Sequence, residues 1–230
     1  MARILGTFAL LVSLALSASS CSNNGRGDNK TNLRFINAVP DVRSVNFIID
    51  FDIFFKDVDY LVSSGYFDID TTPHIFQVTP SNSLTTIAES RSSLSSKSDF
   101  TFIAYGPSDR PAELLLRDDN EPAGDTSFKL RPVNVASSFS PVNMYITTEP
   151  SSISGTTPLE EDFGYRSVGE YAVGQSGSYF IVAADARTGK VIRRSPAQNF
   201  KERAVYTVLL TDAPGSEGPM NIVILEDSEG

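Results

Sequence analysis

The chain has 230 residues, of which 40% are hydrophobic and 20% charged, a composition typical of a folded globular protein rather than a disordered one. The formal net charge at pH 7 is −9, which opposes contact with phosphate backbones, so we expect no nucleic-acid partner. The single cysteine, Cys21, excludes disulfide bonds within a chain, so packing must stabilise the fold.

Residues 1–20 predict a signal peptide. Arg3 supplies a positive charge, residues 4–16 form an apolar run, and small residues then lead to Cys21. A membrane span needs about 20 apolar residues, whereas this shorter run suits the core of a signal peptide. Small residues just before a cysteine resemble the lipobox of bacterial lipoproteins.

That resemblance implies cleavage after Ser20, acylation of Cys21 and attachment to a membrane through the acyl chains. The expected location is the bacterial cell envelope. In Gram-negative lipoproteins an aspartate after the cysteine favours inner-membrane retention, so Ser22 implies the outer membrane if the host is Gram-negative. A free secreted protein with an incidental cysteine is the alternative.

Residues 21–32 contain no large apolar side chain and predict a solvated tether. From residue 33 onward, apolar residues alternate with polar ones, as Val45, Phe47 and Ile49 do, and turn-forming residues interrupt the alternation. No long segment has helical periodicity. Many short strands predict a β-sandwich.

The alternation from Val45 to Phe55 fits either one long bent strand or a hairpin about residues 50–52. We favour the hairpin because the whole segment is long for a sandwich strand.

Six short blocks recur in the same order, about 100 residues apart. The matched blocks are Leu33–Asn37 with Leu130–Asn134, Val45–Ile49 with Val142–Ile146, Gly65–Ile69 with Gly169–Val173, Ile75–Val78 with Tyr179–Val182, Phe100–Phe102 with Tyr206–Val208, and Leu116–Asp118 with Leu225–Asp227. This duplication predicts β-sandwich repeats over residues 33–118 and 128–230. The acidic stretch 119–127, with Pro and Gly, is the expected linker.

The segments Leu33–Asp41, Val45–Phe47 and Tyr60–Tyr66 resemble bacterial exported proteins of the domain of unknown function 4397 family. Those proteins carry an RFxNAxPD…VD opening and a later tyrosine–glycine–tyrosine segment, often in tandem. The resemblance implies two tandem immunoglobulin-like antiparallel β-sandwich domains, with no established activity. It is looser in the second repeat, where Ser137 and Ser138 replace the Pro-Asp pair. Where the family usually turns at Asp-Gly, this chain has Asp50–Phe51.

Nucleophilic catalysis needs a base beside the nucleophile. The only histidine, His74, matches Ser178 in the second repeat, so a site shared by both repeats cannot use it. We interpret His74 as a turn-edge residue and expect no catalytic residue, cofactor or metal ligand. The serines lie in loops without a nucleophile-elbow pattern.

Three carboxylate pairs have i, i+2 spacing, which puts both acids on one strand face. They are Asp50 with Asp52, Asp57 with Asp59, and Asp68 with Asp70. Such pairs can hydrolyse glycosides or bind calcium, but more often form the wet face of a sheet. Calcium binding over residues 118–121 stays an open alternative.

Aromatic residues divide into two groups. Six alternating phenylalanines predict the core, namely Phe35, Phe47, Phe67, Phe76, Phe100 and Phe102. Five tyrosines are candidates for surface contacts with a glycan or peptide, namely Tyr60, Tyr66, Tyr105, Tyr165 and Tyr171.

The sequence therefore predicts a lipid-anchored cell-envelope protein, not an enzyme, with a binding or structural role through sandwich loops or edges. Its expected partners are the membrane, through acylated Cys21, and an unknown protein or glycan. An envelope hydrolase is one alternative and predicts His74 close to a serine and a carboxylate. A subunit of an envelope assembly is another, and predicts an exposed apolar patch or an open sheet edge.

Overall fold

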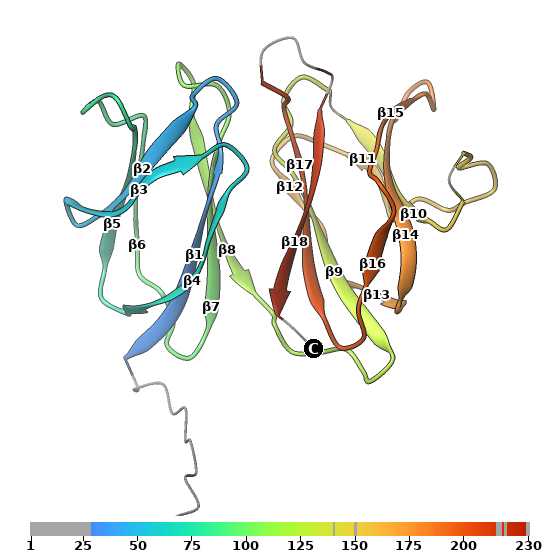
Figure 1. The fold of residues 1–230 in the computed structure, drawn as a ribbon, viewed down its shortest axis with the longest axis horizontal. Coiled ribbons are helices and arrows are strands. Elements are labelled where there is room, and N and C mark those ends of the chain that lie inside the picture. Colours follow the sequence, from blue (N-terminus) through green and yellow to red (C-terminus); the bar gives the residue numbers. More distant parts are fainter. Residues whose placement is uncertain (1–28, 140, 150, 215–217, 219, 229–230) are drawn as a thin grey trace, which may run out of the picture.

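The computed structural model describes residues 29–228, apart from 140, 150, 215–217 and 219. Within this range the chain forms strands and no helix, which confirms the all-β prediction (Figure 1). The signal peptide and the lipidation site Cys21 lie outside the described residues. No helix long and apolar enough to cross a membrane occurs in the described range.

The N-terminal sandwich contains eight strands. They are β1 (Lys30–Ala38), β2 (Ser44–Ile49), β3 (Asp52–Asp59), β4 (Ser63–Asp70), β5 (His74–Pro80), β6 (Ala88–Ser92), β7 (Asp99–Tyr105) and β8 (Ala112–Asp118). One sheet has the order β4-β1-β7-β8 and the other β3-β2-β5-β6.

The C-terminal sandwich follows after residues 119–126. Its strands are β9 (Ser127–Asn134), β10 (Val142–Thr147), β11 (Glu160–Phe163), β12 (Ser167–Val168), β13 (Ala172–Gln175), β14 (Gly177–Asp185), β15 (Val191–Arg194), β16 (Gln198–Phe200), β17 (Val205–Thr211) and β18 (Asn221–Ser228). One sheet has the order β12-β9-β17-β18, with β13 also paired to β9, and the other β11-β10-β14-β15, with β16 paired to β14.

Each sandwich has one parallel strand pair. Strand β1 runs parallel to β7, with Leu33 opposite Phe100, and β9 runs parallel to β17, with Leu130 opposite Tyr206. The other described pairs are antiparallel, as expected. Hydrophobic alternation reports which face of a strand is buried but not the direction of its neighbour, so the sequence did not reveal the parallel pairs.

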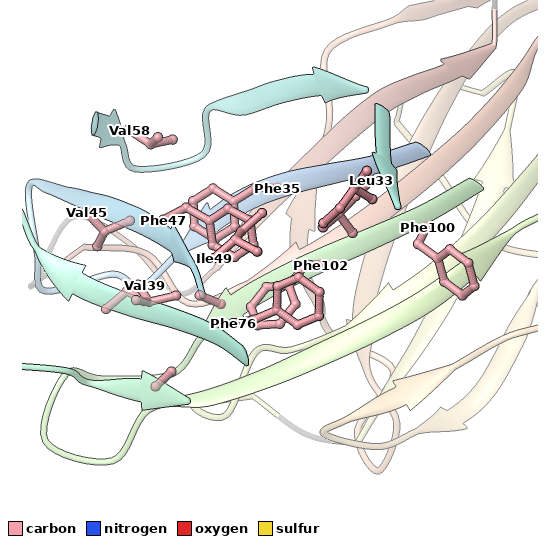
Figure 2. Close-up of a cluster of buried hydrophobic side chains, with 14 of the residues drawn as sticks. Leu33, Phe35, Val39, Val45, Phe47, Ile49, Val58, Phe76, Phe100 and Phe102 are labelled. Carbon is pink, nitrogen blue, oxygen red and sulfur yellow. The ribbon is translucent and has the colours of Figure 1, made fainter. Parts of the chain in front are cut away.

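The core of the N-terminal sandwich is aromatic. Phe35 stacks on Phe47 with ring centroids 4.3 Å apart, and Phe102 lies 5.2 Å from Phe47 (Figure 2). Of the six predicted core phenylalanines, five are buried and Phe67 is partly buried against the same cluster. Alternation on β1, β2 and β7 thus placed this core correctly.

The predicted hairpin is confirmed. Strands β2 and β3 are joined by Asp50 and Phe51, whose φ angles are 51° and 73°. Positive φ at both central residues is the signature of a type I′ turn, which matches the twist of antiparallel strands.

Two of the six matched blocks are displaced by one residue. Phe47 lies opposite Val78 in one repeat and Met144 opposite Ala183 in the other, so Val78 corresponds to Ala183, not to Val182. Likewise Leu33 lies opposite Phe67 and its counterpart Leu130 lies opposite Ala172, so Phe67 corresponds to Ala172 and Tyr66 to Tyr171. A slip of one residue inverts the face of a strand. The counterpart of His74 is therefore Tyr179 rather than Ser178.

The two sandwiches pack against each other through β1, β7 and β8 on one side and β9, β17 and β18 on the other, in the middle of the molecule (Figure 1). The apolar residues buried there are Ile36, Ala38, Ile103, Tyr105 and Leu116 from the first repeat and Val133, Val135 and Leu209 from the second. This third core therefore holds the two sandwiches together.

Candidate functional site

The asparagines that recur in the sequence blocks brace the backbone. Asn37 Nδ2 donates to the carbonyl of Val58 (2.9 Å), and its Oδ1 accepts from the N–H of Val39 (3.1 Å). Asn134 makes the same two bonds in the second repeat, at 2.9 and 3.0 Å. The asparagine side chain thus ties the loop after the first strand to an edge strand of the opposite sheet, which is a structural role.

The second asparagine pair holds a left-handed backbone. Asn46 accepts from the N–H of Asp57 (3.1 Å) and Asn143 from that of Asp162 (3.0 Å). The φ angles of the two aspartates are 56° and 47°. Aspartate tolerates this conformation better than most residues, so the Val-Asn element of each block encodes the bend of an edge strand.

The Pro-Asp element also has a structural role, and in the second repeat the hydrogen-bond donor and acceptor are exchanged between the two loops. Asp41 accepts from the backbone N–H (2.8 Å) and the hydroxyl (2.7 Å) of Ser108 on the loop after β7. In the second repeat Ser137 donates to Asp212 through its N–H (3.0 Å) and hydroxyl (2.8 Å). The acid and the serine have exchanged loops, so the departure of Ser137 from the pattern is compensated.

Six buried polar residues form a closed ring between the sandwiches, which we call the six-residue ring. Arg34 donates to Thr101 (2.8 Å), and Thr101 donates to Asp118 (2.7 Å). Asp118 is ion-paired with Arg131 at 2.6 Å. The ring continues through the second repeat.

On that side Arg131 donates to Thr207 (3.1 Å), Thr207 donates to Asp227 (2.7 Å), and Asp227 is ion-paired with Arg34 at 2.7 Å. Each arginine is therefore neutralised by the aspartate of the other repeat. Burial alone would lower the pKa of Arg34, but Asp227, Tyr66 and Asp118 raise it above its usual value, so the guanidinium is charged.

Of the five tyrosines that were candidates for surface contacts, Tyr105 is fully buried in the junction between the sandwiches. The guanidinium carbon of Arg34 lies over the Tyr66 ring, 4.7 Å from its centroid. The Tyr66 hydroxyl donates to Asp118 (2.7 Å). Tyr171 lies under Arg131 at 5.1 Å.

The remaining two tyrosines span the junction. Tyr60 donates to the carbonyl of Asp212, and Tyr165 packs edge-on against Tyr105 with centroids 6.0 Å apart. Tyr60 and Tyr165 thus contact the other repeat of the same chain.

Calcium binding over residues 118–121 is disfavoured because two of the carboxylates there already have partners. The Asp118 side chain is fully buried in the six-residue ring, and Asp119 is ion-paired with Lys129 at 2.8 Å. An open polar hollow of about 650 Å³ does lie beside residues 97–99 and 117–121. Across the described residues no group of three or more His, Cys, Asp or Glu side chains is placed to hold a metal ion.

His74 bridges two turns. Its Nδ1 lies 2.6 Å from Asp50 Oδ2, and its Nε2 lies 3.0 Å from the carbonyl of Asp70. Both ring nitrogens have partners, and these are aspartates rather than a serine. The hydrolase alternative required a serine in reach of His74, so this geometry does not support it.

Burial alone would lower the pKa of His74, but hydrogen bonds with Asp50 and Asp70 raise it above 6.5. The hydrogen bond from the N–H of Ile75, followed by that with His74, lowers the pKa of Asp50, and bonds from Thr72 lower that of Asp70.

The sign of the pH dependence follows. The histidine's contribution to stability is complete below its unfolded pKa and is lost as pH rises through its raised folded pKa. The aspartates' contribution is lost only as pH falls through their lowered values. Wild type should melt at a higher temperature than His74→Gln, and this difference should shrink between about pH 6 and 9. The decrease should be at most about 2–4 °C, since half-exposed pairs contribute about 1 kcal/mol. Calorimetry of both proteins across this range tests it, and a constant or growing advantage would refute it.

The outstanding exposed feature is an aromatic surface on the edge strands β3 and β4. Phe51, Ile53 and Phe54 are 73%, 56% and 47% exposed. The Phe54 ring lies 4.6 Å from that of Phe67 and 5.4 Å from that of Phe55. We call these five residues the aromatic edge.

A β-bulge aims Phe54 outward. Phe47 lies opposite Phe55 and Ile48 opposite Ile53, which leaves Phe54 without a partner in β2. Bulges re-aim side chains and also disrupt the edge of a sheet. The aromatic edge is therefore suited to contacts through side chains.

Phe51 is unfavourable for folding in two ways. A bulky residue at φ 73° is strained by roughly 1–2 kcal/mol, and its side chain is largely exposed. Sequence reasoning did not single out this surface. The available signal was Phe51 itself, at a turn position where the resembled family has glycine.

Comparison with curated proteins gives no match. Among solved structures, the chain is similar to the CBMbc module (family CBM26) of Eubacterium rectale Amy13K, solved with maltoheptaose, at 9% identity and TM-score 0.28, covering 87% of this chain and 98% of that one. It is also similar to family 41 carbohydrate-binding modules of streptococcal virulence factors, in a study of α-glucan recognition, at 12% identity and TM-score 0.25, covering 80% and 95%. At these scores the likeness carries no argument about a ligand.

The family comparison is specific. The sequence matches the family described as Domain of unknown function (DUF4397) over residues 31–145, a stretch that runs from β1 into β10 and equals half of the chain. It includes Arg34, Asn37, Asn46 and Asp118, which brace the fold as described above. The chain therefore belongs to the DUF4397 family.

Proposed function

We propose that this chain is a lipid-anchored, non-catalytic binding protein of the bacterial cell envelope, and that its aromatic edge docks on a partner protein. Acylated Cys21 would hold it at the membrane, and the tether would space the paired sandwiches from the lipid.

The observation that carries this proposal is Phe51. A side chain that is both strained and exposed persists when something other than folding requires it, and Ile53 and Phe54, which follow Phe51 closely in the chain, are exposed as well. Exposed apolar patches on soluble domains mark interaction sites, and aromatic residues supply much of the binding energy in protein interfaces.

Charge indicates the chemistry of the partner. Strand β3, which supplies most of the aromatic edge, also carries the exposed acids Asp52, Asp57 and Asp59, against one exposed lysine, Lys56. An apolar surface with a basic rim complements this arrangement. A protein partner therefore fits better than an anionic membrane surface, which these carboxylates would repel.

A retention experiment tests the binding role. Residues 22–230 are immobilised and exposed to envelope extract of the native cells, in wild-type form and as a Phe51→Ser/Phe54→Ser variant. Loss of two exposed anchors should reduce the retained partner at least about tenfold, since interface anchors contribute about 2 kcal/mol or more each, and high salt should weaken binding.

The matched control is Val173→Ser, which removes an exposed apolar side chain from the other sandwich and should leave retention unchanged. Protease treatment of the extract should abolish retention. Survival of binding after proteolysis, with loss after glycosidase treatment, would identify a glycan instead, and equal retention by the double variant would refute the site.

The anchor has its own test. Cys21→Ala should abolish incorporation of radioactive palmitate into the chain and leave it uncleaved or released from the envelope, because the thiol is the acylation site. Persistent labelling of Cys21→Ala would contradict the anchor without bearing on the aromatic edge.

A further inference from the structure

The surface between the two sandwiches is self-complementary. The positions that correspond between the repeats, Arg34 with Arg131 and Asp118 with Asp227, pair crosswise. Residue i of one repeat contacts residue j of the other while j contacts i, which is the defining property of an isologous, two-fold interface.

The apolar part of the junction has the same symmetry. Ile36 and Val133 are corresponding positions, as are Ile103 and Leu209, and all four are buried in the shared cluster. The tyrosines follow the same rule. Tyr60 and Tyr165 occupy equivalent turns, and each contacts the end of the central strand of the other repeat.

The linker is largely exposed, although its first residue, Asp119, pairs with Lys129 and donates its backbone N–H to the Tyr171 hydroxyl. Residues 119–126 join β8 to β9 and contain Pro122 and Gly124. Their extended reach is about 26–29 Å. Linkers of this kind give a high effective concentration, about millimolar, that favours pairing within a chain.

We propose that this interface can be formed by a second copy of the chain, giving a dimer in which the two chains exchange their C-terminal sandwiches. Each exchanged unit closes the six-residue ring with Arg34, Thr101 and Asp118 from one chain and Arg131, Thr207 and Asp227 from the other. No new contact is needed, so the exchange changes connectivity and not chemistry. It is favoured wherever chains are concentrated, for example on a lipid surface.

Charge reversal provides a selective test. Chain X carries Arg34→Asp and chain Y carries Asp227→Arg. In an unexchanged X, two aspartates face each other at the ring, and in an unexchanged Y, two arginines do. In the exchanged X–Y dimer every acid faces an arginine. Position 34 of X, now acidic, meets position 227 of Y, now basic, and the unmodified pair is restored in the other unit.

The experiment refolds residues 22–230 of X, of Y and of an equimolar mixture at high concentration, and measures mass by native mass spectrometry. We expect an X–Y heterodimer in the mixture, at least about tenfold more abundant than X–X or Y–Y dimers. The control is one chain carrying both changes, whose ring is complementary within the chain and which should be mainly monomeric.

Wild-type chains with and without ¹⁵N, refolded together, give a second measurement that needs no substitution, and a minor fraction of mixed-isotope dimers is expected beside the monomer. A mixture of X and Y that yields no heterodimer, or wild-type chains that yield no mixed dimer, overturns the proposal. The substitutions lie away from the aromatic edge, so failure here is distinct from failure of the proposed function.

Discussion

Replacing Arg34 by alanine should destabilise the protein by about 3–5 kcal/mol, because the change leaves the buried carboxylate of Asp227 without its counter-charge. The variant also loses the hydrogen bonds to Thr101 and the contact with the Tyr66 ring. For a chain of this size about 1 kcal/mol shifts the melting temperature by roughly 2–4 °C, so a fall on the order of 10 °C is expected in calorimetry.

The effect should depend on pH. Burial raises the pKa of Asp227, and Arg34 and Thr207 act against it. Without Arg34 the pKa rises further, so the folded variant binds a proton that the unfolded chain has released near neutral pH. Stability then falls as pH rises, and the deficit of Arg34→Ala should be larger at about pH 8 than at about pH 5.

Arg203→Ala is the matched control, since Arg203 also pairs with an aspartate, Asp125, but both side chains are at least half exposed. Exposed pairs contribute about 0–1 kcal/mol, so this variant should remain close to wild type. If Arg34→Ala costs no more than Arg203→Ala, the six-residue ring does not stabilise the junction.

Phe51→Gly should stabilise the fold and weaken partner binding. Glycine removes the strain of φ 73°, worth about 1–2 kcal/mol, and costs about 0.5–1 kcal/mol in chain entropy. The expected net gain is about 1 kcal/mol, a rise of roughly 2–4 °C in melting temperature. Retention of the envelope partner should fall at least about tenfold, as with the serine variant.

Phe51→Ala separates the two effects, because alanine removes the ring but keeps the strained backbone. It should lose binding without gaining stability. Retained binding in Phe51→Gly would remove the main support for the aromatic edge, whereas lost binding without a gain in melting temperature would show that the turn is not strained.

Much of the fold could be predicted from the sequence. Phe35 and Phe47 lie on strictly alternating positions, so period-two patterning identified their shared face, and the turn at Asp50 followed from strand length. The slip at Ile75–Val78 has a physical cause. In β14, Tyr179 to Ala184 is apolar throughout, so alternation could not fix its register.

The candidate sites were harder to predict. The blocks containing Arg34 and Asp118 were recognised as a repeat, but pairing across repeats is a tertiary fact that no local pattern reports. The exposure of Phe54 arises from a bulge that adds one residue to β3, and periodicity cannot detect such an insertion in advance.

The reversed polarity of the Asp41–Ser108 and Ser137–Asp212 bonds has a consequence for the gene. Recombination between the repeats, with a crossover inside one of them, would combine the loop carrying Asp41 with the loop carrying Asp212 and set two carboxylates against each other. The reciprocal product would leave two serines there. Such hybrids would lose the hydrogen bonds between these loops, so the swap disfavours homogenisation of the two copies.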